Sequence, residues 1–372
     1  MRLNGLSLLM TADAVGGVWQ YATDLAGALA AHGVRTTLAV LGPAPSTEAL
    51  AEAVAIPQTR VVITGLSLDW TAADAGEVGE AGRAVAELAR ETRADVVHLN
   101  SPALAAEARF PAPVVSVCHS CLATWWQAVR SGPLPADFAW RTALLARGYR
   151  AADALTAPTA AFARTTAAAY GIPEPFVVRN GRQPPSRSDE LAPQAPADLV
   201  FTAGRLWDEG KKLLALDRAA ARLSVPVVAA GPLTGPNGAA IALPHLQTLG
   251  RLPDEEVRAW LYRRPVFASV PRYEPFGLAA LEAAQAGCAL VLSDIPTLRE
   301  LWDGAAVFVD PDDDAALADA LAGLIADPAR RAALGAAAEA RADHYTLENA
   351  AKGMMAIYER LTARAAVREA VA

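Results

Sequence analysis

The stretch that decides the fold is PVFASVPRYEPFGLAALEAAQAG, residues 265–287. It begins with an apolar run that has no helical period, which is typical of a strand buried on both faces. Pro271 ends this run, a turn carries Glu274, and the residues that follow have helical spacing as far as Gly287. The stretch therefore predicts a central strand, a turn at its carboxyl end, and a helix.

The start of this predicted helix is suited to an anion. The first amides, those of Phe276, Gly277 and Leu278, would lack partners within the helix, and the helix dipole favours negative charge at this end. Glu274 and Glu282 flank these amides, about two turns apart at ~3.6 residues per turn. The pattern indicates a ligand with phosphate in its middle and hydroxyl groups at both ends, such as a nucleotide sugar.

The stretch resembles the signature of the retaining glycosyltransferases of family 4, which have the GT-B fold. The resemblance implies that Glu274 faces the donor sugar, that Glu282 binds the nucleotide ribose, and that the amides between them hold the distal phosphate. It also implies transfer of a hexose from a UDP or GDP sugar to a hydroxyl group, with retention and without a metal or other cofactor. An ordinary strand–helix unit with surface glutamates is the alternative.

A second motif, GRLWDEGKK at residues 204–212, follows the first predicted strand of the second half of the chain. The resemblance implies that Arg205 and Lys211 reach the donor diphosphate. Fixed cations aimed at a departing phosphate stabilise the transition state more than the bound substrate. Lys212 competes with Lys211 for this role, and the spacing favours Lys211; two surface basic residues are the alternative.

Other donor contacts are implied at strand ends. Gly16 and Gly17 follow the first predicted strand, and the resemblance places this glycine pair against the donor diphosphate. His119 directly follows another strand and is implied to contact the sugar and the reaction centre, although Ser120 stands where the family has aspartate. A structural, hydrogen-bonded role for His119 stays open. Leu252 lies where the family's backbone meets the nucleobase.

An acceptor pocket is expected near residues 122–140, a tryptophan-rich segment interrupted by glycine and proline. We expect this segment to be irregular. Its side chains Trp125, Trp126 and Arg130 are candidates for the acceptor site, because aromatic faces stack on sugar rings or apolar groups. Anchoring of a loop into the core is the alternative role of the tryptophans.

Length and patterning predict two α/β domains. The chain has 372 residues, which is long for one domain, and strands alternate with helices in both halves. The expected fold class is GT-B, with two Rossmann-like, doubly wound parallel sheets and a cleft between them. The expected parts are an acceptor-side domain at residues 1–183, a linker at 184–197, a nucleotide-sugar domain at 198–342, and a C-terminal helix at 343–372 that returns to the first domain.

Composition excludes several classes of function. A net charge of −7 argues against a nucleic-acid-binding face. Cys118 and Cys121 form a CHSC motif whose redox or zinc role would need further ligands, so reduced cysteines are expected, including Cys288. The acidic run at residues 310–314 is interpreted as a helix cap and not as a metal site.

No signal peptide or membrane-spanning stretch is evident, which predicts a cytoplasmic protein, with peripheral membrane contact left open. The acceptor is expected to be a hydroxyl group of a small molecule, of a glycan or of a lipid-linked acceptor. Two alternatives remain: a non-catalytic, two-lobed sugar- or nucleotide-binding protein, and an epimerase of GT-B fold.

Overall fold

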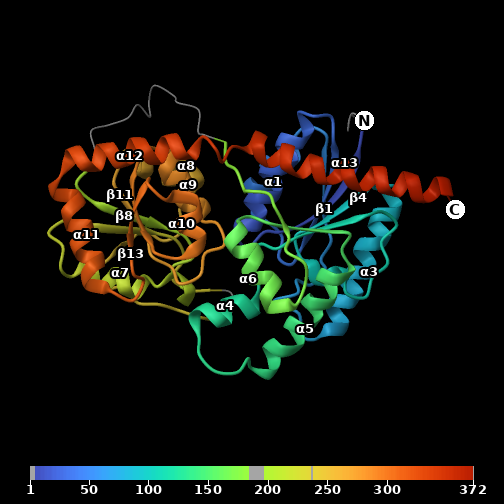
Figure 1. Ribbon diagram of the computed structural model, residues 1–372, viewed down its shortest axis with the longest axis horizontal. Helices are drawn as coiled ribbons and strands as arrows, with labels where there is room; N and C mark the ends of the chain where they lie inside the picture. The colour runs from blue at the N-terminus through green and yellow to red at the C-terminus, as the bar shows by residue number, and fades with distance from the viewer. Residues whose placement is uncertain (1–4, 184–196, 236–237, 372) are drawn as a thin grey trace. The chain divides into compact units, whose positions relative to one another are not determined.

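The computed structural model describes residues 5–183, 197–235 and 238–371 of the chain (Figure 1). The chain forms two compact units. The first comprises Met1–Gln127, Ser131–Gly181 and Leu347–Ala372, and the second comprises Ala128–Arg130 and Arg182–Thr346. The chain thus passes from the first unit to the second at Gly181, and the linker predicted at 184–197 lies, apart from its last residue, outside the described residues.

The first unit is built on a parallel sheet whose strand order is β3-β2-β1-β4-β5-β6-β7. Its strands are β1 (Ser7–Asp13), β2 (Arg35–Leu41), β3 (Thr59–Ile63), β4 (Val96–Leu99), β5 (Val114–Val117), β6 (Ala154–Ala157) and β7 (Phe176–Val177). The other elements are α1 (Gly17–Ala30), α2 (Thr47–Ala55), α3 (Ala75–Glu91), η1 (Pro102–Ala105), α4 (Leu122–Val129), α5 (Ala136–Ala151), α6 (Ala160–Tyr170) and α13 (Leu347–Val371). Helix α13 therefore belongs to the first unit although it ends the chain.

One core of the first unit lies between its sheet and the helices α1 and α13. Alternate residues of β1, Leu8 and Met10, face this core, as the two-residue period of a strand requires. Leu25 of α1 and Met354 of α13 pack against them, and all four side chains are almost fully buried. The C-terminal helix is consequently part of the hydrophobic core of this unit.

The second unit is built on a parallel sheet of strand order β10-β9-β8-β11-β12-β13. Its strands are β8 (Val200–Ala203), β9 (Val227–Ala230), β10 (Gln247–Thr248), β11 (Val266–Ser269), β12 (Ala289–Ser293) and β13 (Ala306–Val309). Its helices are η3 (Glu209–Lys211), α7 (Leu213–Ala220), α8 (Asp254–Tyr262), α9 (Leu278–Gln285), α10 (Pro296–Trp302), α11 (Asp314–Ala326) and α12 (Pro328–Ala342).

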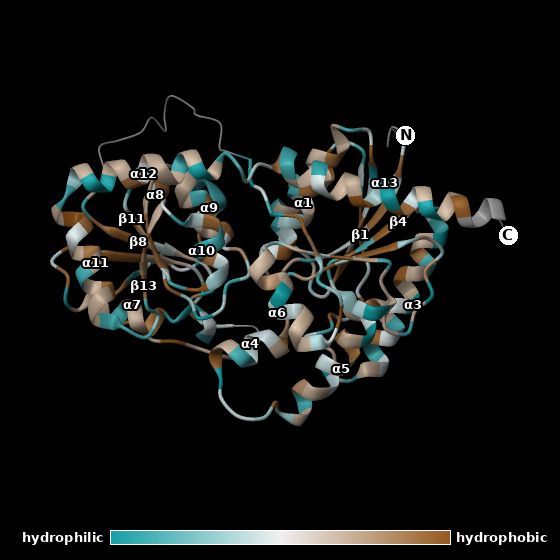
Figure 2. Ribbon diagram, viewed as in Figure 1, coloured by the Kyte–Doolittle hydropathy of each residue, from teal (hydrophilic) through white to brown (hydrophobic). Residues whose placement is uncertain are grey.

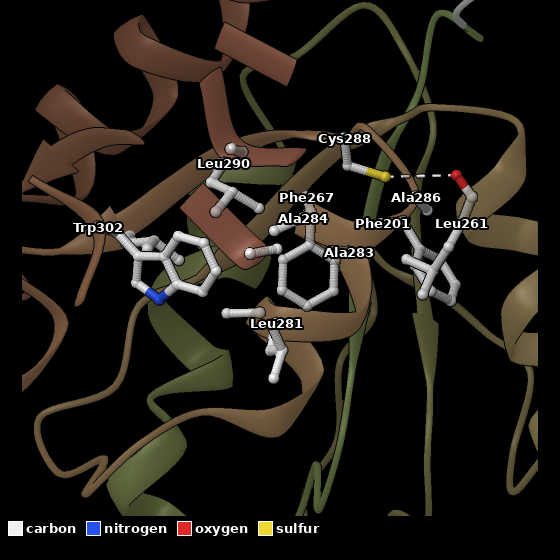
Figure 3. Packing of buried hydrophobic residues seen from close by; sticks show 14 of the residues in the cluster. Phe201, Leu261, Phe267, Leu281, Ala283, Ala284, Ala286, Cys288, Leu290 and Trp302 are labelled. Atoms are coloured by element: carbon white, nitrogen blue, oxygen red, sulfur yellow. Dashed lines mark hydrogen bonds between the residues drawn. The ribbon is translucent and has the colours of Figure 1, made fainter. Parts of the chain in front are cut away.

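Both faces of the second sheet are covered by helices. Phe201, Phe267 and Leu290 face a core shared with α8, α9, α10 and α12, and Figure 3 shows Phe267 close to Leu281 and Trp302. The alternate strand residues face a second core formed with α7 and α11. Most residues of the strands β8 and β11 are accordingly hydrophobic (Figure 2). Two parallel sheets, each with helical crossovers, confirm the predicted pair of Rossmann-like α/β units.

Two local predictions were wrong. The segment after His119, expected to be irregular, begins with helix α4; the glycine and prolines that suggested a loop come only after Val129. Helix α9 begins at Leu278 and not at Phe276, because Gly277 adopts a left-handed backbone with φ of 91°.

The acidic run at 310–314 does cap a helix, as predicted. The carboxylate of Asp313 accepts hydrogen bonds from the amides of Ala315 and Ala316, at 3.0 and 2.8 Å, at the start of α11. Within the described ranges, no group of three or more His, Cys, Asp or Glu side chains is arranged to hold a metal ion. No helix in the described part of the chain has the length and hydropathy needed to cross a membrane.

Candidate active site

The predicted donor-binding residues of the second unit follow neighbouring strands. Strand β8 pairs in parallel with β11, so the loops after both strands leave the same edge of the sheet. Arg205 follows β8 and Glu274 follows β11. Ligands of open parallel sheets bind outside this carboxyl edge.

Two glycines shape this edge. The backbones after β8 and β9 approach so closely that a Cβ on Gly231 would lie 1.8 Å from the carbonyl oxygen of Gly204. Both glycines have φ near 145°, which other residues rarely adopt. Arg205 follows directly, and its guanidinium donates to Asp208 at 3.0 Å while its side chain remains 48% exposed. The arginine is thus held at the edge with surface left for a ligand.

The two adjacent lysines have different partners. The ammonium of Lys211, in η3, donates to the carboxylate of Glu274, and these side chains are only 22% and 14% exposed. Lys212 adopts a left-handed backbone with φ of 53°, and its ammonium donates to Pro311 O and to Asp312. Lys211 therefore lies with Glu274, whereas Lys212 holds the loop before α11.

The start of α9 lies beside this ion pair. No side chain of the described residues caps the helix, and the described part of the chain supplies no acceptor for the amides of Gly277 and Leu278. The Phe276 side chain is buried and packs edge-on against Tyr345, with ring centroids 5.8 Å apart. These amides are polarised donors close to the side chain of Glu274, which pairs with Lys211.

Glu282, the second glutamate, forms an ion pair that the sequence did not reveal. Its Oε1 lies 2.8 Å from Nε of Arg182, and Arg182 also approaches Asp254 at 3.7 Å. Asp254 opens α8, two residues after Leu252, which is half-buried against the core. Arg182 thereby links the segment expected to meet the base with the helix expected to meet the ribose. Its only sequence signal was a basic residue after the Asn-Gly pair at 180–181.

In the first unit, the predicted residues also gather at a carboxyl edge. Strands β1, β4 and β5 are neighbours, and they lead to the glycine pair Gly16–Gly17, to Asn100 and to His119 respectively. Gly16 precedes the first residue of α1, and Tyr21 of this helix packs edge-on against His119 with ring centroids 4.6 Å apart. His119 is half-buried and donates from Nε2 to Asn100 at 2.8 Å.

The tryptophans considered for the acceptor site lie on α4. Both are half-buried, and Nε1 of Trp126 donates to Gly132 O at 3.1 Å. Its ring packs edge-on against Phe138, with centroids 5.7 Å apart, and Trp125 lies 6.5 Å from it. Arg130, grouped with the second unit, pairs with Glu209 of that unit. The acceptor role of these residues stays a prediction.

The three cysteines are free and buried. Burial raises the pKa of Cys118 to about 12 and also raises the pKa of Cys121 and of Cys288. Neutral thiols of this kind are poor nucleophiles and poor metal ligands.

The fold and the comparisons with known proteins together define a glycosyltransferase of GT-B type. The family model described as Glycosyltransferase Family 4 matches residues 15–184, and the model described as Glycosyl transferases group 1 matches residues 239–341. The second match includes the stretch from Glu274 to Glu282. The chain belongs to the family 4 glycosyltransferases.

Among its relatives, the D-inositol 3-phosphate glycosyltransferase of Xylanimonas cellulosilytica is 31% identical over 314 residues, which cover 74% of each chain. The sucrose-phosphate synthase of Thermosynechococcus elongatus shares the fold, with a TM-score of 0.77 and 18% identity over 96% of this chain and all of that one. HepE of Anabaena, solved in complex with UDP and glucose, has a TM-score of 0.69 at 17% identity, over 95% and 99% of the two chains.

Proposed function

We propose that this chain is a retaining hexosyltransferase that moves a hexose from a UDP or GDP sugar to a hydroxyl acceptor. The observation that carries the proposal is the ion pair of Lys211 with Glu274 beside the uncapped start of α9. In this proposal, the cation, the carboxylate and the polarised amides would meet the donor where its diphosphate joins its sugar. The names of its relatives, which include an inositol phosphate glycosyltransferase and a protein solved with UDP and glucose, support this class of substrate.

The chemistry requires positive charge at the departing diphosphate. As the glycosidic bond breaks, negative charge grows on the leaving phosphate oxygen, and fixed donors stabilise this charge more than they stabilise the ground state. Lys211, the amides of Gly277 and Leu278, and the guanidinium of Arg205 are the groups that would supply this field. Arg205 can contact two phosphate oxygens at once, while Lys211 acts as a compact charge.

Glu274 serves the sugar in this proposal. The ammonium of Lys211 donates to Oε2 of Glu274 and would also contact the diphosphate, while the other carboxylate oxygen, Oε1, would accept from the sugar hydroxyls. The threonine hydroxyl of Thr297 donates to the backbone oxygen of Glu274 at 2.6 Å and fixes the turn that carries it. The carboxylate is thereby held in one place as charge develops on the sugar ring.

Glu282 binds the ribose in this proposal, because a carboxylate accepts two hydroxyl hydrogen bonds. Its ion pair with Arg182 orients it, and the backbone near Leu252 meets the base. Gly16 and Gly17 are proposed to lie against the diphosphate, His119 against the sugar, and Trp125 and Trp126 against the acceptor. Since lysine, arginine and helix amides supply the positive field, we propose that transfer needs no metal ion.

The test is a panel of UDP and GDP hexoses. A bound donor at one hundred times its dissociation constant should stabilise the protein by about 2.7 kcal/mol, which a thermal-shift screen resolves. The stabilising donor should be hydrolysed slowly without acceptor, with a product whose anomeric configuration, read by NMR, matches the donor. Hydrolysis should persist in excess EDTA. An inverted product, or absence of turnover with every donor that binds, would refute the proposal.

A further inference from the structure

A partly buried hydrogen-bond network in the first unit centres on Asn100, which directly follows β4. The backbone N–H of Asn100 donates to Thr11 Oγ1 at 2.9 Å. The side-chain Nδ2 of Asn100 donates to the backbone oxygen of Thr11 at 2.6 Å. A carbonyl oxygen only accepts, so the group facing Thr11 O must be the NH₂ group. This contact fixes the orientation of the Asn100 side chain.

The other end of the side chain, Oδ1, faces two imidazole rings. Nε2 of His119 lies 2.8 Å from it, and Nε2 of His98 lies 3.2 Å from it. Because Oδ1 has no hydrogen, both Nε2 atoms must carry one. The other ring nitrogen of His98, Nδ1, accepts a hydrogen bond from the hydroxyl of Tyr358 on α13, which lies 2.6 Å away. In the described part of the chain, no partner contacts Nδ1 of His119.

We propose that Asn100 is a positioning residue that holds His119 as the neutral Nε2–H tautomer, so that Nδ1 presents a lone pair to a hydroxyl group of the bound sugar. The inference rests on the proposed function for its ligand. It assigns the imidazole the role of hydrogen-bond acceptor and excludes that of proton donor or cation. Asn100 acts through His119 and does not itself touch the sugar.

The electrostatic surroundings agree with a neutral ring. Burial, and secondarily the neighbouring His98, lower the pKa of His119 to about 3, and burial lowers the pKa of His98 to about 4. The aromatic edge of Tyr21 covers one side of His119. The ring therefore stays uncharged at neutral pH, as an acceptor of a hydroxyl hydrogen requires.

The first test reads the tautomer of His119 in the wild-type protein. The chain has five histidines, so ¹⁵N NMR of histidine-labelled protein gives few signals, and His119→Gln identifies those of His119. We expect a protonated Nε2 and an unprotonated Nδ1 in the wild type at neutral pH. A protonated Nδ1, a mixture of tautomers or an imidazolium would overturn the proposal.

The second test separates positioning from general stability. Asn100→Ala removes the acceptor that favours the Nε2–H tautomer of His119. It should slow the single-turnover reaction by about tenfold, the loss expected for one hydrogen bond of roughly 1.4 kcal/mol. The matched control is Tyr358→Phe, which removes a buried hydrogen bond of the same network but leaves the contact between Asn100 and His119 in place. Its turnover and its His119 signals should resemble the wild type.

Equal losses of turnover in both variants would overturn the positioning role. If no donor sugar is turned over by the wild type while the NMR signals report the Nε2–H tautomer, the proposed function fails and the tautomer assignment stands. The NMR measurement therefore tests the tautomer of His119, and the kinetic measurement tests the proposed function, so one can fail without the other.

Discussion

Replacement of Lys211 by methionine removes one ammonium from the carboxyl edge of the second sheet while it keeps most of the side-chain stem. The neighbouring Lys212→Met is its matched control, because each lysine forms one ion pair with an acidic side chain. The two variants have the same change in charge and composition. They differ in the ion pair that is lost: Lys211 pairs with Glu274, whereas Lys212 pairs with Asp312.

The expected magnitudes differ for physical reasons. Lys211 is 22% exposed and pairs with Glu274, which is 14% exposed, so its field acts with little screening. The loss of one such transition-state contact lowers the rate by ~10²–10³, or about 2.7–4 kcal/mol. Lys212 pairs with Asp312, which is 55% exposed, and exposed pairs contribute about 0–1 kcal/mol to stability. Lys212→Met should therefore change the melting temperature slightly and the chemical rate hardly at all.

The assay is single-turnover hydrolysis of the donor sugar at saturating enzyme, which isolates the chemical step from binding. Thermal unfolding of both variants confirms that each is folded. Equal rates for Lys211→Met and the wild type would refute the reasoning, as would a loss in Lys212→Met as large as that in Lys211→Met. A loss in Lys211→Met that disappears at higher enzyme concentration would show that the lysine contributes to binding only.

Three further predictions concern stability and acceptor use. Burial holds the pKa of His98 at about 4, below its ordinary 6.5, so the unfolded chain binds more protons than the folded chain between these pH values. The free energy of unfolding should therefore fall as the pH falls from about 6.5 towards 4. His98→Gln should flatten this dependence in acid unfolding curves. Gly335→Ala should destabilise the protein by ~1–3 kcal/mol, because a Cβ would lie 2.3 Å from a backbone carbonyl oxygen. Gly323→Ala, on α11 with open space around it, should stabilise the protein by roughly 0.5–1 kcal/mol. Denaturant midpoints that shift in the same direction for Gly335→Ala and Gly323→Ala would contradict the packing argument. Alanine at Trp125 and Trp126 should raise the KM for the acceptor and leave donor hydrolysis unchanged; a parallel loss of both activities would assign the tryptophans to the core instead.

The parts that sequence predicted well are local. The strand–turn–helix from Val266 to Gln285 is encoded by a change of hydrophobic period and by glycine and proline between the two elements, all within one short stretch. Lys211 was preferred over Lys212 by spacing alone. The physical reason, a left-handed backbone at Lys212 that turns its side chain to another loop, is a tertiary feature with no sequence pattern of its own.

The parts that sequence missed depend on residues far apart in the chain. In the sequence, Asn100 is one polar residue after a strand, with no special signal. Its contact with Thr11, 89 residues earlier, fixes the direction of its side-chain amide and is visible only in the fold. His98 lies within an apolar strand, and its partner Tyr358 lies 260 residues later on a helix whose pattern shows only that one face is apolar. The only sequence signal of Arg182 is its place after the Asn-Gly pair at 180–181, and its pairing with Glu282 appears only when the second unit is folded. Local pattern therefore locates the backbone positions of a site, because strand ends and helix starts are set by nearby residues. Which protons and charges those positions carry is decided by distant partners, so the tautomer of His119 and the partner of Glu282 had to come from the fold.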